Sequence, residues 1–199
     1  MKKFMVCCLF FLSGVLLATV SAGVDRGALN GWTVRKTWHF SCQPISFSQS
    51  LDKKWVFVLG DDSTVHIYSI DGEEKGSIPV ANGTLALDIE PRGKRLYLLN
   101  ENKKYTAINI SFSADSLEWS IQKSWKTTTR PLSFVHSKNK ELVFVLEEDN
   151  AVHIYSFSGH PLGSIPVSSS TVAIDIMPRK SLLYLVDEKN TYTALKLFF

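Results

Sequence analysis

The segment Val56-Phe57-Val58-Leu59 returns 87 residues later as Val143-Phe144-Val145-Leu146, and nearly all of the surrounding chain returns with it. When residues 32–112 are set against residues 119–199, no gap is needed and 38 of the 81 positions are identical. The chain is therefore a tandem duplication. Whatever structure the first half adopts, the second half is expected to repeat.

Each half contains a shorter repeat of its own. Residues 44–70 match residues 84–110 at an offset of 40, and a step of 47 residues then completes the offset of 87. Each unit consists of short runs rich in Val, Ile, Leu, Tyr and Phe, separated by Asp, Gly, Asn, Lys and Pro, which is typical of strands and turns. Strands are predicted in the first unit at 44–49, 55–59, 64–70 and 75–80.

Four strands in each of four units is the pattern of β-propeller blades. The sequence therefore predicts an all-β, four-bladed β-propeller built from two tandem two-blade repeats. The predicted blades span about residues 44–80, 84–125, 131–167 and 171–199.

The two ends of the chain suggest how the ring closes. Residues 119–125 read as the outer strand of the second blade, and their repeat partner, residues 32–38, precedes the first blade. The fourth blade stops after its third strand, so we expect residues 32–38 to supply its outer strand and leave no unpaired edge. The alternatives are an open chain with a spare N-terminal strand, pairing with a second copy, or a head-to-tail dimer that forms one eight-bladed ring.

The N-terminus resembles a secretory signal. Lys2 and Lys3 precede an apolar stretch that runs to about Val20, and small residues follow up to Ala22. We expect a signal peptide over residues 1–22, a single propeller domain over residues 23–199, and a periplasmic, extracellular or cell-surface location. No transmembrane segment is expected after cleavage.

Charge and cysteine content exclude some classes of partner and bond. Loss of Lys2 and Lys3 lowers the formal net charge from +3 to +1 (3 − 2), which gives no basis for a nucleic-acid partner. Cys7 and Cys8 leave with the signal, so Cys42 has no partner for an intramolecular disulfide. A buried, unreactive thiol is expected at Cys42, with an intermolecular bridge as the alternative.

Motifs for catalysis are absent from the sequence. There is no nucleophile elbow, no His-Glu-x-x-His and no glycine loop of the phosphate-binding kind. His66 and His153 are repeat partners within Val-His-Ile-Tyr-Ser strands, where packing or a satisfied hydrogen bond is the expected role. The sequence therefore favours a protein that is not an enzyme, and no catalytic residue and no cofactor is predicted.

One pair of carboxylates is a candidate cation site. Asp88 and Asp175 are repeat partners on the innermost strands of opposite blades, so in a closed ring they would face each other across the axis. Two carboxylates in a narrow channel would bind a divalent cation or share a proton. The alternative is that each accepts hydrogen bonds from the backbone of the neighbouring turn.

The tryptophans of the outer strands are candidates for binding a partner. They could form an exposed aromatic surface, although partial burial between blades explains them equally well. The four residues are Trp32, Trp38, Trp119 and Trp125.

The segment Leu87–Asn100 resembles the YVTN-type, lactonase-like β-propeller repeat, as do Ile176–Arg179 with Leu183–Asp187, and Asp52–Leu59. The resemblance implies the propeller fold and an extracytoplasmic location. Relatives of this type usually have more blades, most often seven, so the resemblance does not transfer an active site to a chain of four blades.

These observations lead to one expected function and two alternatives. The expected function is a secreted, non-catalytic β-propeller that acts as a protein-interaction or ligand-binding scaffold in the cell envelope, as a monomer or homodimer. The first alternative is a small cation-dependent, lactonase-like hydrolase that uses a cation near Asp88 and Asp175. The second is a structural, self-assembling subunit.

Overall fold

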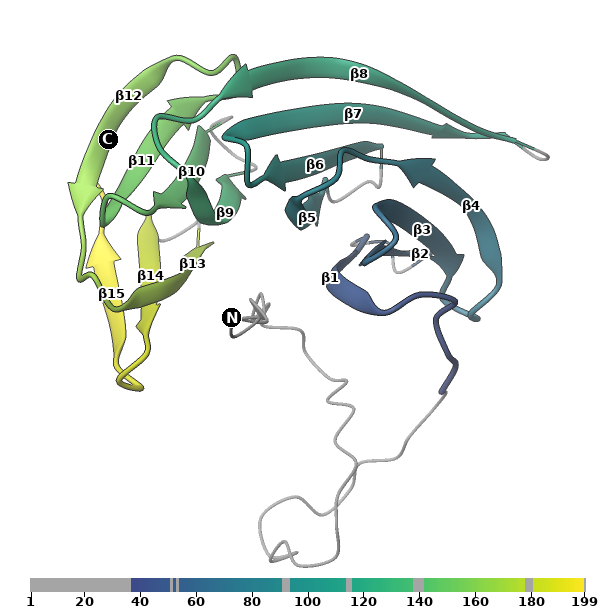
Figure 1. Cartoon of the computed structure of the whole chain (residues 1–199), viewed down its shortest axis with the longest axis horizontal. Coiled ribbons are helices and arrows are strands. Elements are labelled where there is room, and N and C mark those ends of the chain that lie inside the picture. The colour runs from purple at the N-terminus through teal and green to yellow at the C-terminus, as the bar shows by residue number, and fades with distance from the viewer. Residues whose placement is uncertain are drawn as a thin grey trace, which may run out of the picture.

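The computed structural model describes residues 37–50, 52, 54–90, 94–113, 116–137, 142–177 and 181–198. The regular secondary structure of these residues consists of strands, which form four antiparallel sheets. Each sheet is one blade, and the blades follow one another around an arc (Figure 1). The prediction of an all-β chain with four propeller blades is confirmed.

The strand bounds agree closely with the repeat units of the sequence. Blade 1 contains β1 (Pro44–Gln49), β2 (Trp55–Gly60), β3 (Thr64–Ser69) and β4 (Glu74–Pro79). Blade 2 contains β5 (Thr84–Ile89), β6 (Arg95–Asn100), β7 (Lys104–Phe112) and β8 (Leu117–Lys126). Blade 3 contains β9 (Pro131–Ser137), β10 (Leu142–Glu147), β11 (Ala151–Ser156) and β12 (Pro161–Pro166). Blade 4 contains β13 (Thr171–Met177), β14 (Leu182–Asp187) and β15 (Tyr192–Lys196).

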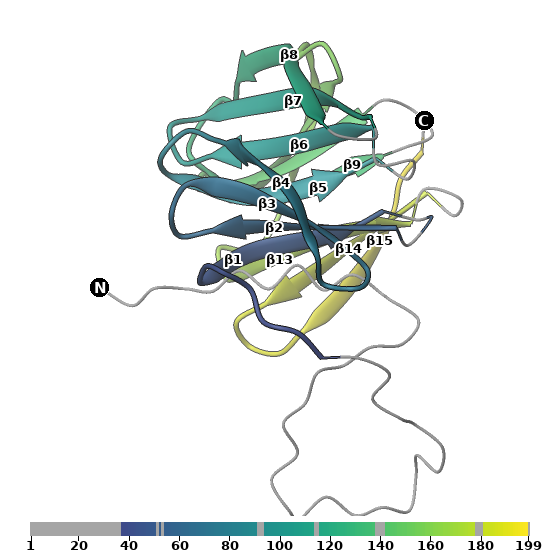
Figure 2. The ribbon, with the colours of Figure 1, turned by 90° about the vertical axis from the view of Figure 1, so that its right-hand side faces the viewer.

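The hydrophobic core lies between neighbouring blades. Because a middle blade has another blade on each side, both faces of its sheet are buried, and strands such as β6 and β10 are apolar along almost their whole length. Three apolar clusters fill the spaces between blades 1 and 2, blades 2 and 3, and blades 3 and 4. Figure 2 shows strands of the first two blades running along the axis down which Figure 1 is viewed.

The innermost strands define the arc and its opening. Strand β5 contacts β1 and β9, and β9 also contacts β13, so the four blades are adjacent in chain order. Strands β1 and β13, at the two ends of this series, lie on opposite sides of the opening of the arc (Figure 1).

Several expectations for the N-terminus lie outside the described residues. These are the signal peptide over residues 1–22, Trp32, and residues 32–36 of the predicted closing strand. Thr37 and Trp38 are described and lie just before blade 1, where they are not part of a strand. Within the described residues, blade 4 therefore has three strands, with β15 at its outer edge.

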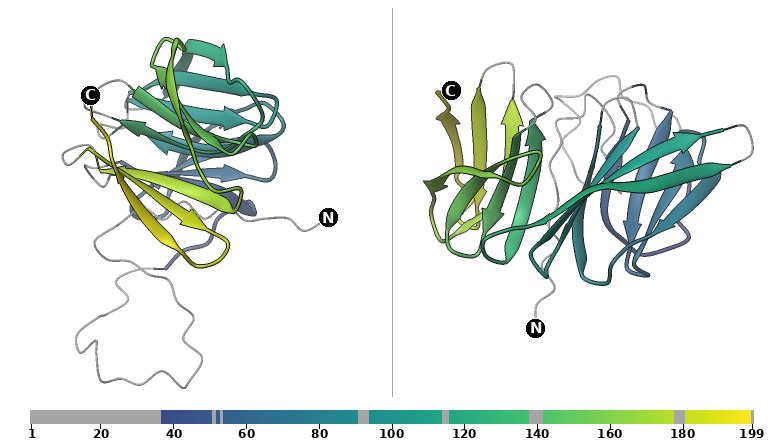
Figure 3. Two further views of the ribbon diagram at one scale, coloured as in Figure 1. Left: turned by 90° about the vertical axis from the view of Figure 1, so that its left-hand side faces the viewer. Right: turned by 90° about the horizontal axis from the view of Figure 1, so that it is seen from above.

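The hairpin of β7 and β8 is longer than the other hairpins and reaches across the outer side of blade 1 (Figures 1 and 3). Leu117, at the start of β8, lies directly over the backbone of Gly76 in β4: a Cβ atom added at Gly76 would come within 2.9 Å of the Leu117 side chain. The second blade is thereby held against the first at the periphery as well as at the core.

No helix long and apolar enough to cross a membrane occurs among the residues that the structure describes.

Candidate functional site

Trp125 lies in the interface between blades 2 and 3. Its ring is 4.5 Å from the ring of Tyr105 and 4.7 Å from the ring of Tyr155, measured between centroids. Tyr105 is completely buried, and this burial raises the pKa of its hydroxyl well above the ordinary value. Trp125 thus packs between blades, as the second interpretation of the outer tryptophans proposed.

Trp38 repeats one half of this arrangement on blade 1. Its ring centroid is 5.1 Å from that of Tyr68, the repeat partner of Tyr155. Each tryptophan also covers a glycine with positive φ: Trp38 covers Gly72 (φ 85°), as Trp125 covers Gly159 (φ 88°). Trp38 therefore occupies the place on blade 1 that Trp125, the next-to-last residue of β8, occupies on blade 3.

Trp119 is the most exposed tryptophan among the residues that the structure describes. It is 42% exposed, and Ile121 on the same strand is 60% exposed. The two residues pair with Ile110 and Ile108 of β7, which are buried against blade 1. Trp119 and Ile121 continue that apolar face beyond the cover of blade 1, and we call these two residues the outer-edge patch.

Asp88 lies between blades 2 and 3. It pairs across strands with Tyr97, and directly opposed residues in an antiparallel sheet project to the same face. The carboxylate accepts a hydrogen bond of 2.8 Å from the amide of Ile89. Burial raises the pKa of Tyr97 to about 12, and the negative charge of Asp88 adds to this rise. The ring of His136 from blade 3 stacks on Tyr97 at 4.3 Å, so Asp88 is part of the packed interface.

Asp175 occupies the matching place on blade 4. It pairs with Tyr184, and its carboxylate accepts a hydrogen bond of 2.7 Å from the amide of Ile176. A cation held jointly by Asp88 and Asp175 stays a prediction. Among the described residues, no group of three or more His, Cys, Asp and Glu side chains is placed to hold a metal ion.

His66 lies between two carboxylates on the blade 1 hairpins. Its Nδ1 is 2.9 Å from Glu74 Oε1, and its Nε2 is 2.9 Å from Asp62 Oδ2. Burial lowers the pKa of His66, but the hydrogen bonds and charges of Glu74 and Asp62 raise it, and the net shift is upward. His153 repeats one of these contacts, with Asp149 at 2.8 Å. The predicted role of a satisfied hydrogen bond agrees with this geometry.

Glu147 is a buried carboxylate that the sequence analysis did not single out. Its side chain has no solvent exposure and accepts hydrogen bonds from the Tyr155 hydroxyl at 2.7 Å, the Thr129 hydroxyl at 2.9 Å and the Thr129 amide. Gly60 stands at the matching position of blade 1. A charged residue directly after a strand that is otherwise identical in the two halves is the feature of the sequence that could have indicated a special role for Glu147. Glu147 anchors the segment that links blades 2 and 3.

Cys42 is partly buried and forms no disulfide. Burial raises the pKa of its thiol, and the charges of Asp62 and Asp61 raise it further. A raised pKa reduces the thiolate fraction, which is the nucleophilic form. The expectation of an unreactive thiol agrees with this environment.

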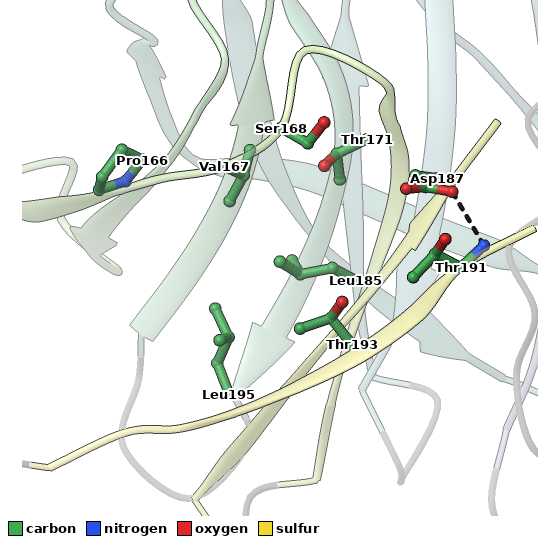
Figure 4. A pocket seen from close by; sticks show the side chains of 9 residues that line it. All are labelled: Pro166, Val167, Ser168, Thr171, Leu185, Asp187, Thr191, Thr193 and Leu195. Carbon is green, nitrogen blue, oxygen red and sulfur yellow. Dashed lines mark hydrogen bonds between the residues drawn. The ribbon is translucent and has the colours of Figure 1, made fainter. Parts of the chain in front are cut away.

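A cavity of about 230 Å³ lies between blades 3 and 4, and Figure 4 shows its lining. Its one carboxylate, Asp187, accepts a hydrogen bond of 2.9 Å from the Thr191 amide in its own turn. The repeat partners of Thr193 and Leu195 are Thr106 and Ile108 of β7, which pair with β8 in blade 2. The cavity therefore lies against the face of β14 and β15 that is turned toward blade 3, next to the edge where an outer strand would complete blade 4. The lining residues are Pro166, Val167, Ser168, Thr171, Leu185, Asp187, Thr191, Thr193 and Leu195.

Comparison with known proteins identifies the fold. No protein-family model matches the chain, and no curated protein matches it. Among solved structures, the chain is similar to the β-propeller domain of Myceliophteria thermophila Cps50 (Swd1), with a TM-score of 0.65 and 12% identity. The match covers 77% of this chain and 53% of that domain, so the chain spans about half the length of the propeller it matches. At this identity the similarity establishes the β-propeller fold alone.

Proposed function

We propose that this chain is a secreted, non-catalytic β-propeller scaffold that binds a protein of the cell envelope through the outer-edge patch of blade 2. The observation that carries the proposal is the exposure of Trp119 and Ile121 on an edge strand. Contiguous apolar patches that are rimmed by polar residues mark interaction sites, and Trp119 and Ile121 lie two residues apart on one strand. Tryptophan is also among the residues that contribute most to binding energy at protein interfaces.

The geometry favours a partner that binds in an extended conformation. Strand β8 pairs with β7 on one side and is the last strand of its sheet within the described residues. The unpaired amide and carbonyl groups of such an edge can accept an added strand, and neighbouring side chains then give specificity. The expected partner is therefore a protein segment that adds to β8 and places apolar side chains against Trp119 and Ile121.

The proposal is tested by crosslinking at the patch. A photo-reactive amino acid is placed at position 119 in the host cell, and in a second strain at Leu162, an exposed residue of β12 that is 59% accessible. Specific crosslinking to one protein from position 119 and none from position 162 supports the proposal. Equal crosslinking from both positions would falsify it.

Affinity for the captured partner gives a quantitative check. Because Trp119 is 42% exposed, Trp119→Ala should lower the unfolding midpoint only modestly and leave the protein folded. Loss of a central aromatic contact of about 2 kcal/mol corresponds to a decrease in affinity of roughly 30-fold. Leu162→Ala is the matched control and should not change the affinity.

Secretion and the resemblance to YVTN-type propellers belong to the same proposal. The charged and apolar pattern of residues 1–22 and the propeller fold are the observations that support them. Sequencing of the N-terminus of the protein isolated from its host tests the first point. We expect the mature chain to begin at Gly23 and to be found outside the cytoplasm; an intact Met1 would contradict secretion by this route.

A further inference from the structure

The two ends of the arc carry surfaces whose complementarity is already visible inside the chain. Blade 2 packs on blade 3 through a buried interface of aromatic and apolar side chains. Blade 4 is the repeat of blade 2, so its open face carries the repeat partners of the blade 2 residues in that interface, 87 positions later. Blade 1 is the repeat of blade 3, so its open face carries the repeat partners of the blade 3 residues, 87 positions earlier. The interface between blades 2 and 3 is therefore a template for contact between blade 4 and blade 1.

Blade 4 presents the same residues as blade 2, but uncovered. Tyr105 is completely buried in the template, whereas its repeat partner Tyr192 is 57% exposed. Ala107 is likewise buried, and its repeat partner Ala194 is exposed. The residues are identical in the two blades. The difference in burial therefore arises because no blade packs against this face of blade 4.

Blade 1 presents the complementary side, which is uncovered at Phe47 and Ile70, whereas Val56, Val58 and Tyr68 on the same face are buried and pack with Trp38 and Cys42. Phe134 is 4% exposed in the template and meets Tyr105 edge to face at 6.1 Å, whereas its repeat partner Phe47 is 48% exposed. Phe157 packs against the template interface, and its counterpart Ile70 is 45% exposed. The open faces of blades 1 and 4 thus correspond to the two sides of the interface between blades 2 and 3.

Trp38 makes one of the two ring contacts that Trp125 makes in the template, and the residue for the second contact would come from a preceding blade. In the template, Trp125 stacks on Tyr105 of its own blade and packs at a tilt against Tyr155 of the next blade. Trp38 already packs on Tyr68, which matches Tyr155. Its second contact would be Tyr192, the exposed tyrosine of β15.

We propose that a second copy of this chain supplies the missing neighbour at both ends. Two copies join head to tail into one eight-bladed ring, in which Trp38 of each copy packs beside Tyr192 of the other. Strands β1 and β13 of one chain stand on opposite sides of the arc (Figure 1), so the open faces of one chain do not meet.

The size of the ring follows from the blade count. One chain superposes on a structure of which it covers about half, and four blades from each of two copies make eight. Eight is the upper end of the usual propeller range, whereas three copies would require twelve blades. Closure also covers Tyr192 and Ala194 of β15, which are exposed in one chain.

A disulfide test distinguishes a second copy from closure within one chain. In the template, Thr106 and Ser124 are directly opposed on β7 and β8. Their repeat partners are Thr193 and Thr37, both exposed, so cysteines there should lie within bonding distance across the seam. Two differently tagged chains, one with Thr37→Cys and one with Thr193→Cys, are co-expressed in a Cys42→Ser background.

The second-copy proposal predicts a disulfide-linked pair of the two tags on a non-reducing gel. No linked pair in the mixture, together with an internal disulfide in a chain carrying both cysteines, would overturn it in favour of closure within one chain. No disulfide in either case also overturns it. The control pair Thr193→Cys with Ser77→Cys on β4 should not link, because Ser77 lies on an outer strand away from the seam.

The mass of the unmodified protein in solution gives an independent test. Native mass spectrometry or sedimentation should show twice the mass of one chain, and Phe47→Asp should shift the protein to single chains. Leu162→Asp adds the same charge on an exposed residue away from the seam and should leave the dimer intact. A single-chain mass for the unmodified protein, or an assembly larger than two copies, contradicts the eight-bladed ring.

Discussion

Replacement of Tyr155 by Phe should destabilise the protein more than the same replacement of Tyr68, its repeat partner. The hydroxyl of Tyr155 donates to the buried carboxylate of Glu147 at 2.7 Å and accepts from the amide of Thr128 at 3.0 Å. The hydroxyl of Tyr68 meets Ser41 at 2.9 Å, and Gly60 stands where Glu147 does in the other half. The two sites therefore differ mainly by one hydrogen bond to a carboxylate.

The expected magnitudes follow from that difference. A hydrogen bond to a charged group contributes about 1.5–3 kcal/mol, and a neutral one contributes about 0.5–1.5 kcal/mol. Tyr155→Phe should therefore lower the free energy of unfolding by roughly 2–4.5 kcal/mol, since a neutral bond and a bond to Glu147 are both lost. Tyr68→Phe should lower it by about 0.5–1.5 kcal/mol.

Equilibrium unfolding in urea measures both changes, with the midpoint and the slope fitted together. Glu147→Gln, alone and combined with Tyr155→Phe, completes a double-mutant cycle that should give a coupling energy of about 1–3 kcal/mol. Equal losses for the two tyrosines, or a coupling energy near zero, would refute the argument that Glu147 makes the second half different from the first.

Two further predictions concern a pH dependence and a turn. The pKa of His66 is raised in the folded protein, so its contribution to stability is fully present below the unfolded pKa of about 6.5 and is lost as the pH rises through the folded pKa. His66→Gln should therefore destabilise the protein more at about pH 6 than at about pH 9 in urea titrations, and a loss independent of pH would contradict this. Gly159→Ala should lower the free energy of unfolding by on the order of 2 kcal/mol, because φ is 88° and the new Cβ would lie 2.5 Å from Trp125 Cγ. Gly163→Ala, where a Cβ meets nothing within 4 Å, is the control and should stay within about 0.5–1 kcal/mol of the parent in thermal unfolding.

Much of the fold could be predicted from the sequence, because its signals are local. Strand positions follow from runs such as Val56–Leu59, and the offset of 87 residues requires the same strands in both halves. The first three blades show four strands each, and the last shows the three that end near residue 196. Residues 32–36, on which the predicted closure depends, lie outside the described residues. The disulfide experiment tests whether the outer strand of blade 4 comes from the same chain or from a second copy.

The site could be predicted only in part. Four tryptophans were candidates on equal terms, because each lies on an outer strand or its repeat. Burial distinguishes two of them: Trp119 is 42% exposed, whereas Trp125 packs between Tyr105 and Tyr155 of neighbouring blades. The burial of a residue on an outer strand depends on whether the neighbouring blade reaches far enough to cover it. The sequence of the outer strand alone does not show how far that blade reaches.

The sequence by itself determined the number of blades, the order of the strands and the duplication, since these follow from short-range periodicity and from identity at a fixed offset. Only the tertiary structure decided the environment of each repeated residue. Tyr105 and Tyr192 are the same residue in the same local pattern, yet one is completely buried and the other is 57% exposed. The physical reason is that burial depends on the neighbouring blade, and an end blade has a neighbour on one side where a middle blade has two.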